Sequence, residues 1–189
     1  MKSEGENMKK YIALLRGINV GGKNKISMKE LKELFVENGY SNVYTYINSG
    51  NVIFSSDDSD SSLLKSRCEA MILERFQYNL SVMVLSEKDL TEALKSAPDW
   101  WDADQESKHN AIFVIPPITV EEVLEKVGEA KPEYEKVSCF GRVIFWSAPK
   151  ITFSKTRWSG IVGTSVYDSI TIRNANTAKK LAELCESCN

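Results

Sequence analysis

Residues 15–30 read LRGINVGGKNKISMKE, the pattern of a strand end, a basic glycine loop and a helix start. The apolar run over 11–20, interrupted by Arg16, is typical of a central strand. Ser27 followed three residues later by Glu30 is a capping box and predicts the helix start. A loop between a strand end and a helix start can turn several main-chain N–H groups toward an anion. This stretch therefore predicts the first elements of the fold and a candidate ligand-binding loop.

The apolar pattern of the first half predicts the order β-α-β-β-α-β. Strands are expected over 43–48 and 51–55, joined by a two-residue hairpin turn at 49–50. A second helix is expected to begin at Asp60, and a strand follows over 80–85. This order is that of the ferredoxin-like split unit.

The second half predicts a similar order, β-α-β-β-α. A strand is expected over 111–115, a helix after a capping box at Thr119, and a hairpin around Gly141. Asn174 or Asn176 is expected to cap the last helix. The predicted fold class is therefore α+β, with two tandem α+β subdomains and a ferredoxin-like first half.

Four segments are expected along the 189 residues. They are a flexible leader over 1–8, a ferredoxin-like subdomain over 9–86, a connecting helix and acidic loop over 87–109, and a second α+β subdomain over 110–189.

The composition excludes several classes of protein. The apolar fraction of 42% and the charged fraction of 26% are those of an ordinary globular protein. No apolar run approaches the roughly 20 residues of a membrane span, so no membrane partner is expected. The N-terminus lacks the apolar segment of a secretory signal, which predicts a cytoplasmic protein. A formal charge of −2 argues against a general nucleic-acid coat protein.

Neither a cofactor nor a metal is expected. Cys185 and Cys188 have C-x-x-C spacing, but they fall at the end of a helix and no second such pair exists. His109, the only histidine, lies outside any nucleophile motif and is interpreted as a surface residue before a strand.

Three separated segments carry a family resemblance. Residues 16–22 read RGINVGG, residues 45–52 read TYINSGNV, and residues 171–177 read TIRNANT. Together they closely resemble the bacterial family called domain of unknown function 1697, in which an aromatic residue is more usual where Ala175 stands. The resemblance implies an α+β protein with a ferredoxin-like first half. It implies no activity and assigns no catalytic residue.

The first group of candidate ligand residues surrounds the glycine loop. Six cations and no carboxylate lie between Lys9 and Lys29 in a chain that is slightly acidic overall. The candidate anion-binding residues are Arg16, Asn19, Gly21, Gly22 and Lys23, with Ser49 and Asn51 as hydrogen-bonding neighbours. A plain turn with solvated lysines is the competing interpretation.

A second candidate group lies near the C-terminus. Asp168 is the only carboxylate between Lys150 and Lys180. The candidate residues are Lys155, Arg157, Arg173 and Asn174, and helix capping around a core tryptophan is the competing interpretation. One hypothesis is that the two basic segments face one cleft between the subdomains.

The predicted function is binding of a phosphate-bearing small ligand, with a nucleotide as one candidate. Residues 17–24 match a P-loop except that Asn24 replaces the Mg²⁺-binding Ser or Thr, so nucleotide hydrolysis is not expected. One alternative is single-stranded nucleic acid, with Tyr44, Tyr46 and Phe54 available for stacking; it is less favoured because the usual aromatic motif is missing. The other alternative is a protein-interaction or structural module without a ligand.

Overall fold

The computed structural model describes residues 8–187. These residues form two compact units: 8–90 with 181–187, and 91–180. The expected leader falls on residues 1–7, outside the described part, and Met8 is exposed. Cys188 also lies outside it. Among the described helices, none has the length and apolarity needed to cross a bilayer.

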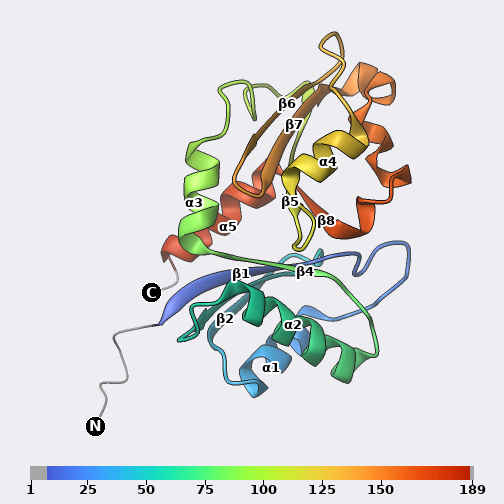
Figure 1. The fold of residues 1–189 in the computed structure, drawn as a ribbon. Helices are drawn as coiled ribbons and strands as arrows, with labels where there is room; N and C mark the ends of the chain where they lie inside the picture. Colours follow the sequence, from blue (N-terminus) through green and yellow to red (C-terminus); the bar gives the residue numbers. More distant parts are fainter. Residues whose placement is uncertain (1–7, 188–189) are drawn as a thin grey trace. The chain divides into compact units, whose positions relative to one another are not determined.

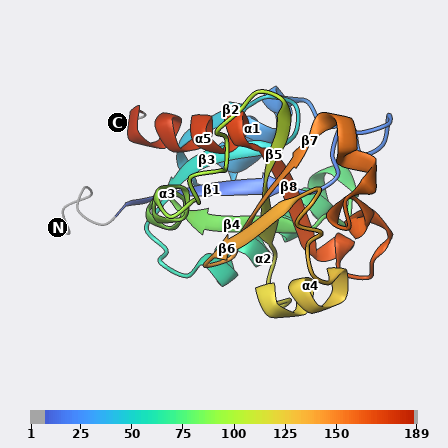
Figure 2. The same cartoon turned by 90° about the horizontal axis from the view of Figure 1, so that it is seen from above.

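The first unit contains one four-stranded antiparallel sheet and two covering helices. Its elements are β1 (Lys9–Leu15), α1 (Met28–Glu37), β2 (Ser41–Tyr46), β3 (Asn51–Ser56), α2 (Ser61–Phe76) and β4 (Val82–Ser86). The strand order is β2-β3-β1-β4, which can be followed in Figure 2. The predicted element order is therefore correct, and the strand order is consistent with the ferredoxin-like interpretation.

Both helices of the first unit begin where local capping chemistry predicts. Ser27 Oγ accepts a hydrogen bond from the Glu30 amide at 3.1 Å. Asp60 Oδ1 accepts one from the Ser62 amide at 2.8 Å. Helices α1 and α2 lie on the same face of the sheet (Figure 1), and the core between them contains Leu31, Phe35, Phe54, Leu64 and Ile72.

The β2–β3 turn is longer than predicted. Tyr46 pairs with Asn51, so the turn has four residues, 47–50, and β2 ends before Ile47. Ile47 has a φ of +47° and is 47% exposed, an unfavourable conformation for a β-branched residue. The two-residue prediction counted residues 47 and 48 as strand because they continue the run from Val43.

The second sheet has the strand order β6-β7-β5-β8 and is also antiparallel. Its elements are β5 (Ser107–Val114), α4 (Val120–Val127), β6 (Lys136–Phe140), β7 (Val143–Pro149) and β8 (Ile170–Asn174). Helix α3 (Glu87–Lys95) precedes them and α5 (Ala175–Ser187) follows; each contributes residues to both units. The α+β fold class is confirmed.

Two features of the second unit differ from the prediction. Residues 170–174 form a strand that was not predicted, because their asparagine was interpreted only as a helix cap. Strand β5 begins at Ser107 instead of Ala111, so His109 is a buried strand residue and its interpretation as a surface residue is wrong.

The segment between β7 and β8 consists of three short 3₁₀ helices, η1 (Lys150–Lys155), η2 (Trp158–Gly163) and η3 (Tyr167–Ser169). Helix α4 and η2 pack on the same side of the second sheet, where Trp158 and Ile161 join its core.

Candidate functional site

The glycine loop ends in a tight exposed turn. The Lys23 amide donates to the Val20 carbonyl at 3.0 Å, and Gly21 and Gly22 have left-handed φ angles of +57° and +78°. Among the described residues, no acceptor pairs with the amides of these two glycines. The loop is separated from the helix, because α1 begins only at Met28. Its geometry is that of a projecting hairpin tip rather than of a P-loop.

Asn19 holds this loop in place. Its Oδ1 accepts the Ile26 amide at 3.0 Å, and its Nδ2 lies 2.9 Å from the Ile26 carbonyl oxygen. The same Nδ2 donates to the Asn48 carbonyl at 2.9 Å. Asn19 has a φ of +54°, a region that asparagine adopts more readily than most residues. One side chain therefore ties the loop to its own base and to the 47–50 turn.

The charge around the loop is positive. Lys23 and Lys25 are exposed and make no ion pair within residues 8–187, whereas Lys29 lies 3.9 Å from Glu33 on α1. Arg16 is half-buried, and its amide donates to the Ser81 carbonyl at 3.0 Å. Lys23 and Lys25 are thus the cations best placed to meet a ligand at the turn.

Ser49 and Asn51 lie at the same end of the sheet, where β1 ends and β3 begins. Asn51 is fully buried, and its Nδ2 donates to the Tyr46 carbonyl at 2.8 Å and to Ser49 Oγ at 3.0 Å. Its side chain closes the turn. The structure therefore places Ser49 and Asn51 at the end of the sheet to which Asn19 anchors the loop, whereas Gly21, Gly22 and Lys23 lie at the tip of that loop.

Lys155 and Arg157 of the second group lie beside a buried carboxylate. Glu135 is 3% exposed, and its two oxygens accept the amides of Arg157 and Trp158 at 2.7 Å and 3.1 Å. They also accept the Lys131 amide at 3.0 Å and the Trp146 indole N–H at 3.1 Å. The main-chain amides of Arg157 and Trp158 therefore already bind a carboxylate, that of Glu135, and are not open to a ligand.

The side chains of Lys155 and Arg157 cover the loop that carries Glu135. The Arg157 guanidinium packs over Gly128, where an added Cβ would lie 3.1 Å from its Nη1. Because Gly128 ends α4, the cation sits at the negative end of that helix dipole. Lys155 Nζ lies 5.6 Å from the centre of the Tyr134 ring.

Arg173 and Asn174 occupy different environments although they are adjacent. Arg173 is 7% exposed and donates to Thr171 Oγ1 at 2.8 Å; burial lowers its pKa to about 10. Asn174 is exposed and caps α5 by accepting the Thr177 amide at 2.8 Å. The four residues of the second group thus lie at three places in the second unit.

The prediction missed a pocket at the start of α5. It has a volume of about 760 Å³ and lies between the loop 102–107, β5 and residues 174–176. Of the predicted ligand residues, only Asn174 lines it. The pocket combines segments about 70 residues apart, so no local pattern in the sequence indicates that His109, Lys150 and Asn176 lie around one space.

His109 forms part of the pocket wall. Its Nε2 lies 2.8 Å from the Asp104 carbonyl oxygen and therefore donates, so in the neutral ring Nδ1 accepts from Ser147 Oγ at 2.7 Å. Ser147 is 5% exposed, which leaves its hydroxyl inaccessible to a substrate. This arrangement ties the loop to β5 and β7, and it assigns no nucleophile.

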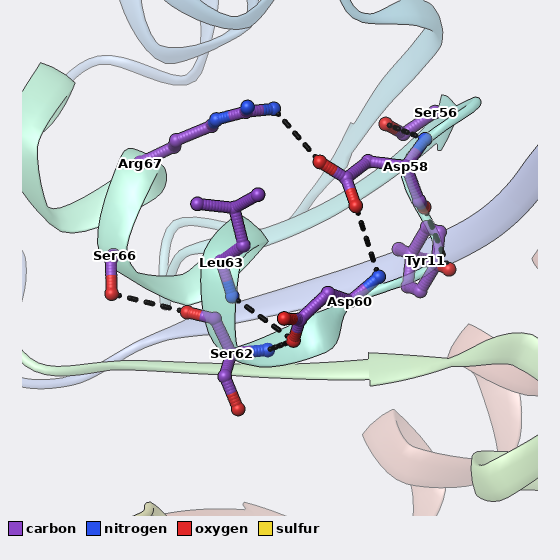
Figure 3. Close-up of polar contacts among 8 residues, drawn as sticks. All are labelled: Tyr11, Ser56, Asp58, Asp60, Ser62, Leu63, Ser66 and Arg67. Carbon is purple, nitrogen blue, oxygen red and sulfur yellow. Dashed lines mark hydrogen bonds and ion pairs between the residues drawn. The ribbon is translucent and has the colours of Figure 1, made fainter.

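The acidic turn before α2 is also ordered rather than solvated (Figure 3). Asp58 Oδ2 lies 3.1 Å from Arg67 Nη1, and Asp58 Oδ1 accepts the Asp60 amide at 3.0 Å. The Asp58 carbonyl accepts the Tyr11 hydroxyl at 3.0 Å. Asp58 is therefore a partnered carboxylate that orders the start of α2.

The aromatic residues of the first sheet do not form a stacking platform on its central strands. Phe54 is fully buried on the helix side, 5.2 Å from the Phe35 ring centre and 4.8 Å from that of Tyr40. Tyr44 and Tyr46 lie on β2, an edge strand. Phe54 is therefore unavailable to stack on a base.

These features define a class, an α+β protein with two four-stranded antiparallel sheets and a rigid basic loop at one end of the first. The chain belongs to the family described as "Protein of unknown function (DUF1697)", whose model matches residues 8–145. The family resemblance carried by the motifs is thereby confirmed.

A solved structure similar to this chain is that of the conserved bacterial protein SP0830 from Streptococcus pneumoniae. The two are 33% identical, the match covers 94% of this chain and 99% of that one, and the TM-score is 0.85. No protein with a curated description matches. The comparisons therefore support an uncharacterised bacterial family and its fold.

Proposed function

We propose that this protein binds a phosphate-bearing small ligand, with a nucleotide as the first candidate, at the glycine-loop site. This site comprises Arg16, Asn19, Gly21, Gly22 and Lys23, with Ser49 and Asn51 beneath it. The observation that carries the proposal is the exposed turn in which two unpaired glycine amides project beside Lys23 and Lys25.

Rigidity of the loop supports this proposal. Asn19 makes hydrogen bonds to Ile26 and Asn48, and Asn24 Nδ2 donates to the Gly17 carbonyl at 3.0 Å. A preorganised loop loses little conformational entropy when an anion binds, which raises affinity. Exposed main-chain amides beside lysines supply the hydrogen-bond donors and the positive charge that a phosphate group requires. The part played by Lys155, Arg157, Arg173 and Asn174 stays a prediction.

We place this activity in the cytoplasm, in a protein without a resident cofactor. Cys68, Cys139 and Cys185 form no disulfide within the described residues, as expected of cysteines in a reducing compartment.

Calorimetric titration with pyrophosphate and with nucleotides tests the proposal. Replacing Lys23 and Lys25 with alanine should weaken binding by about tenfold or more, because two cations leave the turn. Lys32→Ala is the matched control, since Lys32 is an exposed lysine on α1 outside the loop.

Three outcomes would overturn the proposal. If the double variant binds with the same affinity as the unmodified protein, the turn is not part of the binding site. Salt-dependent binding of short single-stranded oligonucleotides, without binding of nucleotides, would favour the nucleic-acid alternative. Indifference to all of these anions would favour the structural-module alternative.

A further inference from the structure

The pocket at the start of α5, called the α5 pocket below, lies wholly within the second unit and shares no residue with the glycine-loop site. Its volume of about 760 Å³ is within the range of small-molecule sites. Its position at the end of β8 brings three asparagines, two lysines and an acidic loop around one space. What the pocket binds follows from its charges, its hydrogen-bonding groups and its lack of aromatic rings.

The side chains that line the pocket carry a net positive charge when Asp102, which forms an ion pair outside the pocket lining, is left out of the count. Asp102 forms an ion pair with Lys179 at 2.7 Å. Asp104 keeps its negative charge, because its Oδ1 accepts the neutral Ser107 amide at 2.6 Å; Lys108 and Lys150 together outweigh this one carboxylate. Lys108 and Lys150 contact no carboxylate in the described part of the chain: Lys108 Nζ lies 4.0 Å from the Phe153 ring centre, and Lys150 Nζ donates to the Gln105 carbonyl.

Hydrogen-bonding groups of the pocket remain available to a ligand. The side chains of Asn110 and Asn176 make no hydrogen bond to other residues within 8–187. Asn174 uses its Oδ1 to cap α5, which leaves its NH₂ group as a donor. Because a carboxamide both donates and accepts, three of them around one space suit hydroxyl groups, which also do both.

No aromatic side chain other than the imidazole of His109 lines the pocket. His109 is itself buried, with 8% exposure, so a purine or pyrimidine would find no open ring face on which to stack, and a lipid would find little apolar wall. A compact polar ligand is favoured over a nucleotide.

We infer that the α5 pocket binds a small polyhydroxylated anion, a sugar phosphate or a sugar acid. Lys150 and Lys108 meet its negative group, and Asn110, Asn174 and Asn176 bind its hydroxyls. The α5 pocket shares no residue with the glycine-loop site, so either proposal can be wrong while the other is right.

Calorimetric titration of the full chain with glucose 6-phosphate, ribose 5-phosphate and gluconate tests this inference. At least one of the three should bind saturably, and at least about tenfold more tightly than inorganic phosphate or glucose alone. Lys150→Met should weaken that binding by about tenfold or more, and Asn176→Ala should also weaken it. Lys136→Met, which replaces an exposed lysine on β6 outside the pocket, should leave it unchanged.

The Lys23→Ala variant separates this inference from the proposed function. If Lys23→Ala abolishes binding of the sugar anion while Lys150→Met does not, the glycine loop is the site and the inference is overturned. Binding of inorganic phosphate as tight as that of the sugar anions would also overturn it, as would the absence of binding by all three. Loss of sugar-anion binding in Lys150→Met alone supports it, whatever happens at the glycine loop.

Discussion

The Asn19 side chain donates a hydrogen bond to the main-chain oxygen of Asn48 at 2.9 Å and so joins the glycine loop to the β2–β3 turn. The two segments are about thirty residues apart in the chain. Their contact ties the loop that carries the exposed amides and cations to the turn that supports it.

Replacing Asn19 with glycine should loosen this loop. Glycine accepts the φ of +54° but removes the bonds to Ile26 and Asn48, so the loss of stability should be about 1–3 kcal/mol. Hydrogen exchange at the Ile26 amide should accelerate, because this amide donates to Asn19 Oδ1. Asn42→Gly, which replaces an asparagine of similar φ (+50°) on β2 outside the loop, is the control and should leave that amide protected; equal exchange in the two variants would contradict the clamping role.

Alanine should be far less tolerated at position 50 than at position 22. At Gly50, with a φ of +82°, a Cβ would lie 2.7 Å from Ile18 Cδ1 and 2.9 Å from Leu15 Cβ, which predicts a loss of about 2–5 kcal/mol. At Gly22, with a φ of +78°, nothing lies within 4 Å, so only the backbone cost of about 1–2 kcal/mol applies. Urea unfolding measures both, and similar losses would show that crowding at Gly50 is unimportant.

Replacing the buried residues Trp146 and Trp158 with phenylalanine should destabilise the protein to different extents. Trp146 Nε1 donates to Glu135, whereas Trp158 Nε1 finds no hydrogen-bond partner among residues 8–187. Both substitutions remove a similar side-chain volume, so the difference between the two losses of stability measures the hydrogen bond from Trp146 to Glu135. Trp146→Phe should cost about 1–3 kcal/mol more than Trp158→Phe in urea unfolding. The opposite order would show that the Glu135 carboxylate does not depend on the indole.

Cys68 should make the protein less stable in alkali. Burial, and secondarily the Glu69 carboxylate, raise the pKa of its thiol from 9.0 to about 12. The unfolded chain therefore loses this proton first, and the stability contributed by the neutral thiol is complete below pH 9 and is lost as the pH rises toward 12.

Urea midpoints measured across that range should fall less steeply in Cys68→Ala than in the unmodified protein. Cys139→Ala, which replaces an exposed thiol, is the control and should leave the slope unchanged. An unaltered slope in Cys68→Ala would contradict the assignment.

The parts of the fold that follow local chemistry were predictable from the sequence. Ser27 and Asp60 begin helices through bonds to amides two or three residues away, so their spacing is sufficient evidence. Strand β8 was missed because its five residues end in an asparagine that also caps the next helix. Asn174 both ends β8 and caps α5, and the sequence-based prediction assigned it only the second role.

Contacts between distant segments explain what the sequence did not reveal about the candidate site. The burial of His109 depends on Ser147, its partner across β5 and β7. Glu135 occupies the amides of Arg157 and Trp158, twenty-two and twenty-three residues away, and no local pattern marks that pairing. The glycine loop could be proposed from the sequence because its glycines and cations are neighbours in the chain.

Anion binding at the glycine loop can be followed by nuclear magnetic resonance of the Gly21 and Gly22 amides during titration with pyrophosphate. Both resonances should shift saturably in the unmodified protein and in Lys32→Ala, and the shifts should weaken strongly when Lys23 and Lys25 are replaced by alanine. Amide resonances that stay in place up to millimolar pyrophosphate, or that shift equally in the double variant, would contradict anion binding at this loop.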